Sequence, residues 1–204
     1  MKIAVIGAGN GGQALSAVLA MRGHDVSLYN RSQKRISPLL LERKIRVEGE
    51  SEGKAKLRYV GTDMKKAIEG AEAIMVVVPA FAHAKIAEKL AECIGEGQIV
   101  VLNPGRTGGA LEFDKIFREK GVREKAVIAE AQTFVFASRI SGPGMVRIFR
   151  IKNAVPLSVL PSKDNESVFP IISEIMPEFT LAKNVLYTSF NNIGAVFHPG
   201  AILM

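Results

Sequence analysis

The residues best suited to proton chemistry stand near the end of the 204-residue chain, in the run Asn191-Asn192-Ile193-Gly194-Ala195-Val196-Phe197-His198-Pro199-Gly200. On a helix, Asn191 and His198 share one face with two small residues, because separations of three, four and seven residues return to the same side. A histidine titrates near neutral pH, so His198 is the candidate catalytic proton donor. Asn191 and Asn192 are candidate substrate contacts. On the residues alone, a capping or interdomain histidine explains the segment equally well.

A glycine motif lies at the opposite end of the chain. The residues Gly7-Ala8-Gly9-Asn10-Gly11-Gly12 fit G-x-G-x-x-G, follow an apolar run at 2–6 and open an Ala- and Leu-rich run at 13–22. A strand before the motif and a helix after it predict a turn that binds the pyrophosphate of a dinucleotide. The glycines permit the tight turn and close approach of the phosphates, and the first N–H groups of the helix hold them. A glycine-rich turn needed only for its backbone geometry is the alternative.

The residues after the next expected strand, 26–29, indicate which dinucleotide binds. An NAD-selective site places Asp or Glu there for the ribose 2′-hydroxyl, whereas this chain has Asn30, Arg31 and Ser32. An amide, a guanidinium and a hydroxyl can all contact a phosphate oxygen. We therefore expect NADP(H) to be preferred over NAD(H), although a solvated helix face would carry similar charges.

Three later loops are expected to complete the pocket, because ligands of a doubly wound sheet lie beyond the carboxyl ends of its strands. The loop residues assigned to the cofactor are Pro79, Ala80, His83, Asn103 and Gly105. Gln132 is assigned to the substrate, and no residue is assigned to a metal. A histidine at the start of a helix, as His83 is, more often packs beside a cofactor than acts as a base. Arg106 can meet either an anionic substrate or solvent.

Strands and helices alternate along the chain. Expected strands are at 2–6, 26–29, 73–79, 98–102, 126–130 and 156–160, and expected helices are at 13–22, 32–44, 62–69, 82–93, 109–120 and 166–175. Ser32 and Thr62 are the expected caps, Pro38 must bend or interrupt its helix, and Pro170 is expected in the first turn of its own. Runs at 45–48 and 56–60 predict a two-stranded excursion, and 133–138 and 145–151 look extended. The pattern predicts a Rossmann-like doubly wound α/β domain with a mostly parallel sheet over residues 1–182.

Composition narrows the class of protein. The formal charge is +7, and residues 1–60 hold 11 Lys and Arg against 5 Asp and Glu. This basic stretch has few aromatic residues for base stacking, so nucleic acid is not the expected partner, and we expect the charge to surround the dinucleotide site. One cysteine, no long apolar run and no secretory leader predict a cytoplasmic protein without a membrane span.

The apolar stretch 183–204 predicts a connecting helix that begins a second, helical domain. Its end carries no cap and no charge cluster, so we expect it to pack either on another subunit of a homodimer or on a complementing C-terminal domain. Domain-size reasoning favours the missing domain.

Several motifs together resemble the NAD(P)-dependent octopine/nopaline (opine) dehydrogenases over essentially the whole chain. They are the glycine motif with Gln13-Ala14-Leu15, Val76-Val77-Val78-Pro79-Ala80, Asn103-Pro104-Gly105 with Thr107 to Phe113, Glu130-Ala131-Gln132-Thr133, and Asn192 through His198-Pro199. The glycine motif is shared with many dehydrogenases, whereas the Asn-Pro-Gly loop and the His-Pro pair are more specific.

The resemblance implies an oxidoreductase that condenses an amino acid with a 2-oxo acid and reduces the imine with a nicotinamide hydride. It implies that His198 polarises or protonates the oxo-acid oxygen, paired with an aspartate of the helical second domain. The 204 residues alone are therefore expected to bind cofactor with little turnover. The alternatives are a hydroxy-acid or ketopantoate-like NADP reductase and a non-catalytic NAD(P)-binding module.

Overall fold

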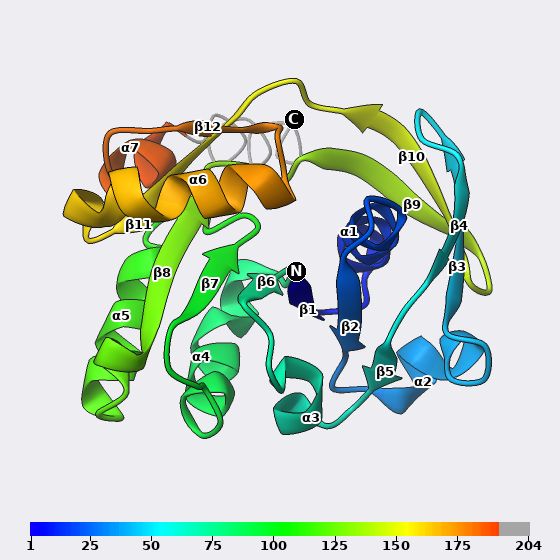
Figure 1. Cartoon of the computed structure of the whole chain (residues 1–204), viewed down its shortest axis with the longest axis horizontal. Coiled ribbons are helices and arrows are strands. Elements are labelled where there is room, and N and C mark those ends of the chain that lie inside the picture. The colour runs from blue at the N-terminus through cyan, green and yellow to red at the C-terminus, as the bar shows by residue number, and fades with distance from the viewer. Residues whose placement is uncertain (192–204) are drawn as a thin grey trace, which may run out of the picture.

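The computed structural model describes residues 1–191, and the remaining 13 lie outside the described part. Eight strands form the central sheet (Figure 1). In sheet order they are β12 (Phe179–Leu181), β11 (Val155–Leu160), β8 (Ala126–Ala131), β7 (Gln98–Leu102), β6 (Ala73–Val76), β1 (Lys2–Ile6), β2 (Asp25–Tyr29) and β5 (Tyr59–Gly61). All neighbours pair in parallel except β8 with β11, which confirms the predicted mostly parallel sheet.

Both faces of the sheet are buried, because alternate residues of each central strand enter different apolar clusters. In β1, Ile3 and Val5 join the cluster that contains α1, whereas Ala4 and Ile6 join the cluster that contains α4 and α5. The helices are α1 (Asn10–Met21), α2 (Gln33–Ile36), α3 (Met64–Ile68), α4 (His83–Ala91), α5 (Gly109–Glu119), α6 (Asn165–Ile175) and α7 (Val185–Phe190). Near-continuous apolar strands are what a sheet covered on both faces requires.

A second sheet of four strands packs over α1 (Figure 1). Its strands, in order, are β4 (Gly53–Lys56), β3 (Lys44–Gly49), β10 (Met145–Ile151) and β9 (Phe136–Gly142). The predicted two-stranded excursion is confirmed as the antiparallel pair β3–β4. The sequence did not reveal that β3 also pairs in parallel with β10, because Arg46 lies opposite Met145, far away in the chain.

Three local predictions were wrong. The helix expected at 32–44 ends at Ile36 and gives way to a short 3₁₀ helix, Ser37–Leu39, because Pro38 cannot donate the hydrogen bond that an α-helix needs. The cap of α3 is Asp63, whose carboxylate accepts the Lys66 N–H at 3.1 Å, rather than Thr62.

The third concerns Pro170, which lies in the second turn of α6 and not in its first. Its missing N–H leaves the Glu166 carbonyl without a helical partner. Both residues are exposed, so water can bind that carbonyl and the helix continues.

Candidate functional site

The glycine turn between β1 and α1 is closely packed at two of its glycines. Gly7 has φ +112°, in the left-handed region, and a Cβ there would lie 2.3 Å from the Val77 carbonyl oxygen. A Cβ on Gly12 would lie 1.7 Å from the carbonyl oxygen of Gly7. Both positions therefore require glycine for the fold itself, whether or not a ligand is bound.

Gly9 is different, because nothing within residues 1–191 requires a glycine there. Its backbone, with φ −74° and ψ −170°, suits any residue, and a Cβ would meet no atom of the described residues within 4 Å. The first turn of α1, which follows it, has no acidic residue and no side-chain cap. Within residues 1–191, no side chain caps the first N–H groups of α1, so they are available to an anion.

Asn10 and Gly11, also assigned to the cofactor, contact the second sheet and the loop that precedes β9. The side-chain oxygen of Asn10 accepts the Ile140 N–H at 3.0 Å, and its carbonyl accepts the Ser138 hydroxyl at 3.3 Å. A Cβ on Gly11 would lie 2.8 Å from the Phe134 ring. These two residues hold β9 and the preceding loop against the start of α1.

Asn30 joins the end of β2 to the glycine turn. Its side-chain oxygen accepts the Ala8 N–H at 3.1 Å, and its amide donates to the Ser32 carbonyl at 2.9 Å. The predicted cofactor residues Ala8, Asn30 and Ser32 are thus brought together by hydrogen bonds. Arg31 is exposed and makes no ion pair within residues 1–191.

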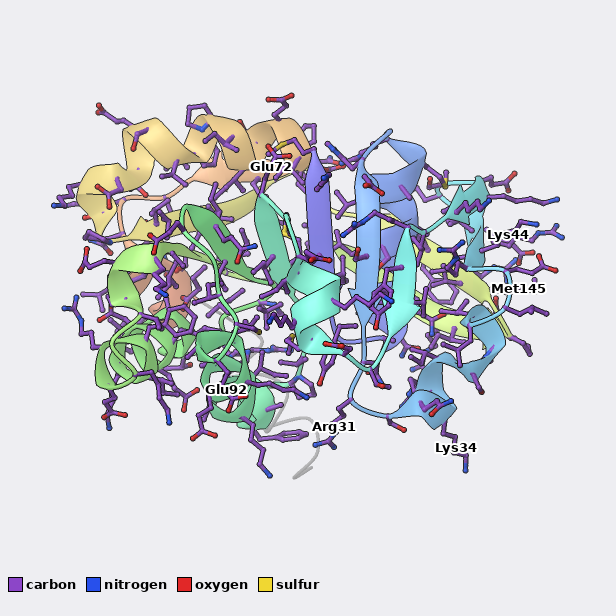
Figure 2. All side chains as sticks on the ribbon, turned by 60° about the horizontal axis from the view of Figure 1, so that its bottom comes forward. Arg31, Lys34, Lys44, Glu72, Glu92 and Met145 are labelled. Carbon is purple, nitrogen blue, oxygen red and sulfur yellow. The ribbon has the colours of Figure 1, made fainter. Side chains whose placement is uncertain are left out.

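Arg31 and Lys34 lie at one end of the central strands, and Glu72 lies at the other. Figure 2 shows Arg31 and Lys34 at the edge of the molecule opposite Glu72. Glu72 precedes β6 and accepts the Lys2 N–H at 2.9 Å, at the amino end of the sheet. Arg31 lies two residues after β2, at the carboxyl end of that strand, where a ligand of this fold binds.

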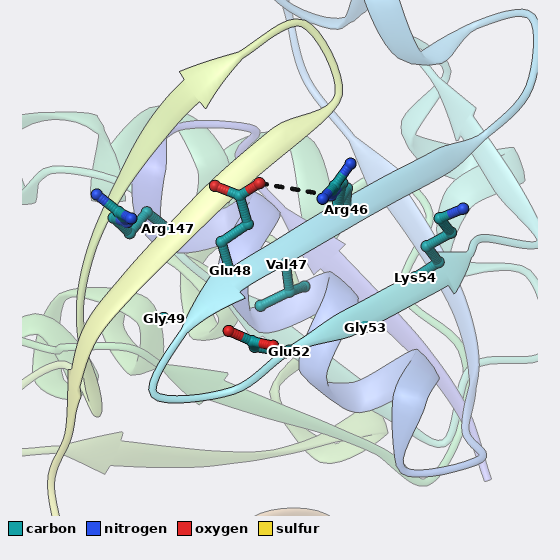
Figure 3. A pocket seen from close by; sticks show the side chains of 8 residues that line it. All are labelled: Arg46, Val47, Glu48, Gly49, Glu52, Gly53, Lys54 and Arg147. Atoms are coloured by element: carbon teal, nitrogen blue, oxygen red, sulfur yellow. Dashed lines mark ion pairs between the residues drawn. The ribbon is translucent and has the colours of Figure 1, made fainter.

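Only some of the cations of residues 1–60 lie at the carboxyl end of the central strands. Arg31, Lys34 and Arg35 follow β2, whereas other cations of residues 1–60 lie on the second sheet, where Figure 2 places Lys44. A hollow of about 560 Å³ on that sheet is lined by Arg46, Val47, Glu48, Gly49, Glu52, Gly53, Lys54 and Arg147 (Figure 3). None of these residues comes from a loop at the carboxyl end of the central strands, so this hollow is separate from the glycine turn.

The residues predicted to bind the cofactor after β6 differ in their exposure. Pro79 and Ala80 are exposed, beside Phe81, whose side chain is 86% exposed. His83 is instead buried between α4 and α5, where its ring meets the edge of Phe113 at 5.9 Å between centroids. Burial, and the positive charge of Arg106, lower the pKa of His83, although a backbone hydrogen bond at Val78 partly opposes this. The imidazole of His83 is therefore neutral near pH 7.

The loop after β7 is fixed by buried contacts. The amide of Asn103 donates to the Val101 carbonyl at 2.9 Å, and the Gly105 N–H donates to the Ala131 carbonyl at 3.1 Å. Asn103 is only 2% exposed, so its side chain shapes the loop from within. The chain then turns at Arg106, which has φ +60° and is exposed.

Glu130, at the end of β8, is a residue whose role the sequence reasoning missed. Its carboxylate is fully buried and accepts hydrogen bonds from the Ala110 N–H at 2.9 Å and from the hydroxyls of Thr188 and Ser189 at 2.8 and 2.7 Å. Burial raises its pKa, although these hydrogen bonds oppose the shift. A charged residue inside the apolar run Ala126–Ala131 was the signal that could have identified it.

Gln132 and Asn191, two predicted substrate residues, are in contact. The side-chain amide of Gln132 donates to the Asn191 carbonyl, directly after α7. The predicted substrate residue Asn192 and the predicted catalytic residue His198 lie outside the described residues.

Two cations flank this turn without carboxylate partners. The Lys152 ammonium donates to the Thr133 hydroxyl at 2.7 Å, and neither Lys152 nor Arg106 makes an ion pair within the described part of the chain. Burial, and the nearby charge of Arg106, lower the pKa of Lys152. The arrangement can accept an anionic group.

Residues 1–191 contain no helix that is both long and apolar enough to cross a bilayer. They also bring together no cluster of three or more His, Cys, Asp or Glu side chains placed to hold a metal ion.

The chain is similar in sequence to known dehydrogenases. The family model of the NAD-dependent glycerol-3-phosphate dehydrogenase N-terminus matches residues 2–126. An opine dehydrogenase of Arthrobacter sp. (strain 1C) is 40% identical over 197 residues, which cover 96% of this chain and 55% of that protein. The chain thus spans about half the length of this relative.

Solved structures share the fold. An octopine dehydrogenase in complex with NADH and agmatine matches with a TM-score of 0.79 at 25% identity, over 92% of this chain and 50% of that one. A yersinopine dehydrogenase with NADP+ bound matches with a TM-score of 0.84 at 14% identity, over 98% of this chain and 51% of that one. The chain belongs to the family of the NAD-dependent glycerol-3-phosphate dehydrogenase N-terminus and is a homologue of the opine dehydrogenases, which confirms the resemblance predicted from its motifs.

Proposed function

We propose that this chain is the cofactor-binding part of an NADP(H)-dependent oxidoreductase that reductively condenses an amino acid with a 2-oxo acid. The observation that carries the proposal is Gly9. Neither backbone strain nor a neighbouring atom of residues 1–191 requires a glycine at this position, so the missing side chain leaves room for a bound group. In a turn that opens a helix after a parallel strand, that group is the pyrophosphate of a dinucleotide.

The preference for NADP(H) is supported by the end of β2. Asn30 stands where an NAD-selective site has a carboxylate, and Arg31 follows it with no partner of opposite charge within residues 1–191. A guanidinium can bind a 2′-phosphate with two hydrogen bonds. The relatives differ in this respect, since one structure contains NADH and another NADP+.

Arg106 and Lys152 support the proposal that the substrates are an amino acid and a 2-oxo acid, both of which carry a carboxylate. These cations lie by the loops after β7 and β8, at the carboxyl ends of the central strands, and can pair with substrate carboxylates. The bound cofactor supplies the hydride. His198 remains the proposed proton donor to the oxo-acid oxygen as water leaves and the imine forms, and Gln132, Asn191 and Asn192 remain proposed substrate contacts.

Cofactor titration tests the first part of the proposal. We expect Arg31→Gln to weaken NADPH binding about tenfold, or about 1.4 kcal/mol, and NADH binding less than twofold. Arg147→Gln removes the same charge on the second sheet and serves as the matched control. Equal affinity of the unmodified protein for both cofactors, or tighter NADH, would contradict the NADP(H) preference.

An activity assay on the full-length gene product tests the reaction. We expect NADPH oxidation only when an L-amino acid and pyruvate are both present. Reduction of the oxo acid without an amine would instead identify a hydroxy-acid or ketopantoate-like reductase. Tight cofactor binding with no turnover on any of these substrates would favour a non-catalytic module.

A further inference from the structure

The buried carboxylate of Glu130 joins three segments that are distant in the chain. Oε2 accepts the N–H of Ala110 in the first turn of α5, and Oε1 accepts the hydroxyls of Thr188 and Ser189 on α7. Glu130 itself lies in β8. The carboxylate therefore holds the start of α5 and the end of α7 to the carboxyl end of β8.

Ser189 extends this contact to the loop after β7. Its hydroxyl oxygen also accepts the Gly108 N–H at 3.1 Å, while its proton is directed to Glu130. On the other side, a Cβ on Gly105 would lie 2.1 Å from Cγ of Glu130. The loop therefore fits closely around the carboxylate, and only a glycine leaves it enough room.

No cation neutralises this carboxylate within residues 1–191. A buried charge is unfavourable unless hydrogen bonds compensate it, and here three donors and the positive end of α5 do so. An apolar side chain would fill the same space without that requirement. Unlike an apolar side chain, the carboxylate also fixes the orientation of the three groups that donate to it.

The partners on α7 lead directly to the proposed substrate residues. α7 ends at Phe190, and the following residue, Asn191, is held by the side-chain amide of Gln132, two residues beyond Glu130. In the sequence, His198 comes seven residues after Asn191. The end of β8 therefore fixes the point from which the candidate catalytic segment departs.

We propose that Glu130 is a positioning residue, which sets α7 against the loop after β7 through Thr188 and Ser189. This inference rests on the proposed function, because it assigns Glu130 to placing the segment that carries the proton donor. It predicts that loosening the contact lowers turnover without weakening cofactor binding, since the glycine turn lies between β1 and α1.

The test compares Thr188→Val, Thr188→Ser and Ser189→Ala in the full-length gene product, well below the unfolding temperature of each variant. Valine keeps the shape of threonine but cannot donate to Glu130. We expect Thr188→Val and Ser189→Ala to lower kcat at least fivefold, with the Kd for NADPH changed less than twofold. We expect Thr188→Ser, which keeps the hydroxyl, to retain turnover. A parallel loss of cofactor affinity, or an unchanged kcat in both variants, would overturn the proposal.

Hydrogen exchange separates this inference from the proposed reaction. In Thr188→Val we expect the amides of residues 187–191 to exchange at least fivefold faster, while those of α1 keep their rate. If the unmodified protein fails to turn over any substrate, the proposed function fails, but the exchange result still decides the placement of α7. Unchanged exchange in that segment would refute the role of Glu130 in either case.

Discussion

The side-chain oxygen of Asn30 accepts the N–H of Ala8 at 3.1 Å, so the residue that follows β2 also holds the glycine turn. Position 30 therefore combines two tasks. It holds the turn in place, and its lack of charge leaves the neighbouring space open to a phosphate. A carboxylate could do the first task but would oppose the second, because it repels a phosphate.

Asn30→Asp tests this combination. Aspartate keeps an acceptor for Ala8 but loses the hydrogen bond to the Ser32 carbonyl and adds a negative charge. We expect NADPH affinity to fall about tenfold, or about 1.4 kcal/mol, while NADH affinity stays the same or improves. Calorimetric titration with both cofactors measures the ratio. An equal loss for the two would show that the variant disturbs the turn and does not discriminate.

Gly9→Ala and Gly12→Ala form a matched pair. The methyl group on residue 9 meets open space, so we expect stability within about 0.5 kcal/mol of the unmodified protein and at least a tenfold loss of dinucleotide affinity. The methyl group on residue 12 meets the Gly7 carbonyl, so we expect a loss of about 1–3 kcal/mol or more. Chemical unfolding and cofactor titration separate the two effects. Full dinucleotide binding by Gly9→Ala would remove the main support for the proposed function.

Glu130→Gln tests the cost of the buried charge. Because burial raises the pKa of Glu130 in the folded protein, ionisation costs stability as pH rises from the unfolded value of about 4.3 through the folded value. Glutamine stays neutral, and the Thr188 and Ser189 hydroxyls can accept its N–H groups. As pH rises from 4 to 7, we expect the free energy of unfolding of Glu130→Gln to increase relative to that of the unmodified protein. A pH-independent difference would show that the pKa is not raised.

His83→Leu tests the opposite titration. Burial and the charge of Arg106 lower the pKa of His83, so protonation favours the unfolded chain and stability is lost as pH falls below about 6.5. Leucine cannot bind a proton, so we expect the His83→Leu variant to lose less stability than the unmodified protein as pH falls. The pKa of His24 is also lowered, but that residue is present in both proteins, and the difference between them therefore isolates His83.

The same variant decides the assignment of His83 to the cofactor. If His83 only packs between α4 and α5, NADPH affinity at pH 7.5 stays within twofold. A loss of tenfold would support the contact with the cofactor that the sequence predicts.

The sequence was informative where a feature is local. The strand, glycine turn and helix of residues 2–21 are adjacent in the chain, and apolar runs identified the central strands. The pairing of β3 with β10 could not be predicted, because no local pattern indicates which distant strand covers an edge. Glu130 was recognised as part of a loop but not as a buried carboxylate, because its partners on α7 are 58 and 59 residues away.

The parallel pairing of β3 with β10 also constrains the order in which the protein can fold during its synthesis. Arg46 pairs with Met145, so about a hundred residues must be translated after β3 before its partner exists. Until then the edge of β3 that later pairs with β10 has no partner strand, while Ile45 and Val47 make this strand apolar. A ribosome that stalls between these two strands would release a nascent chain with an exposed apolar strand edge, a form prone to aggregation.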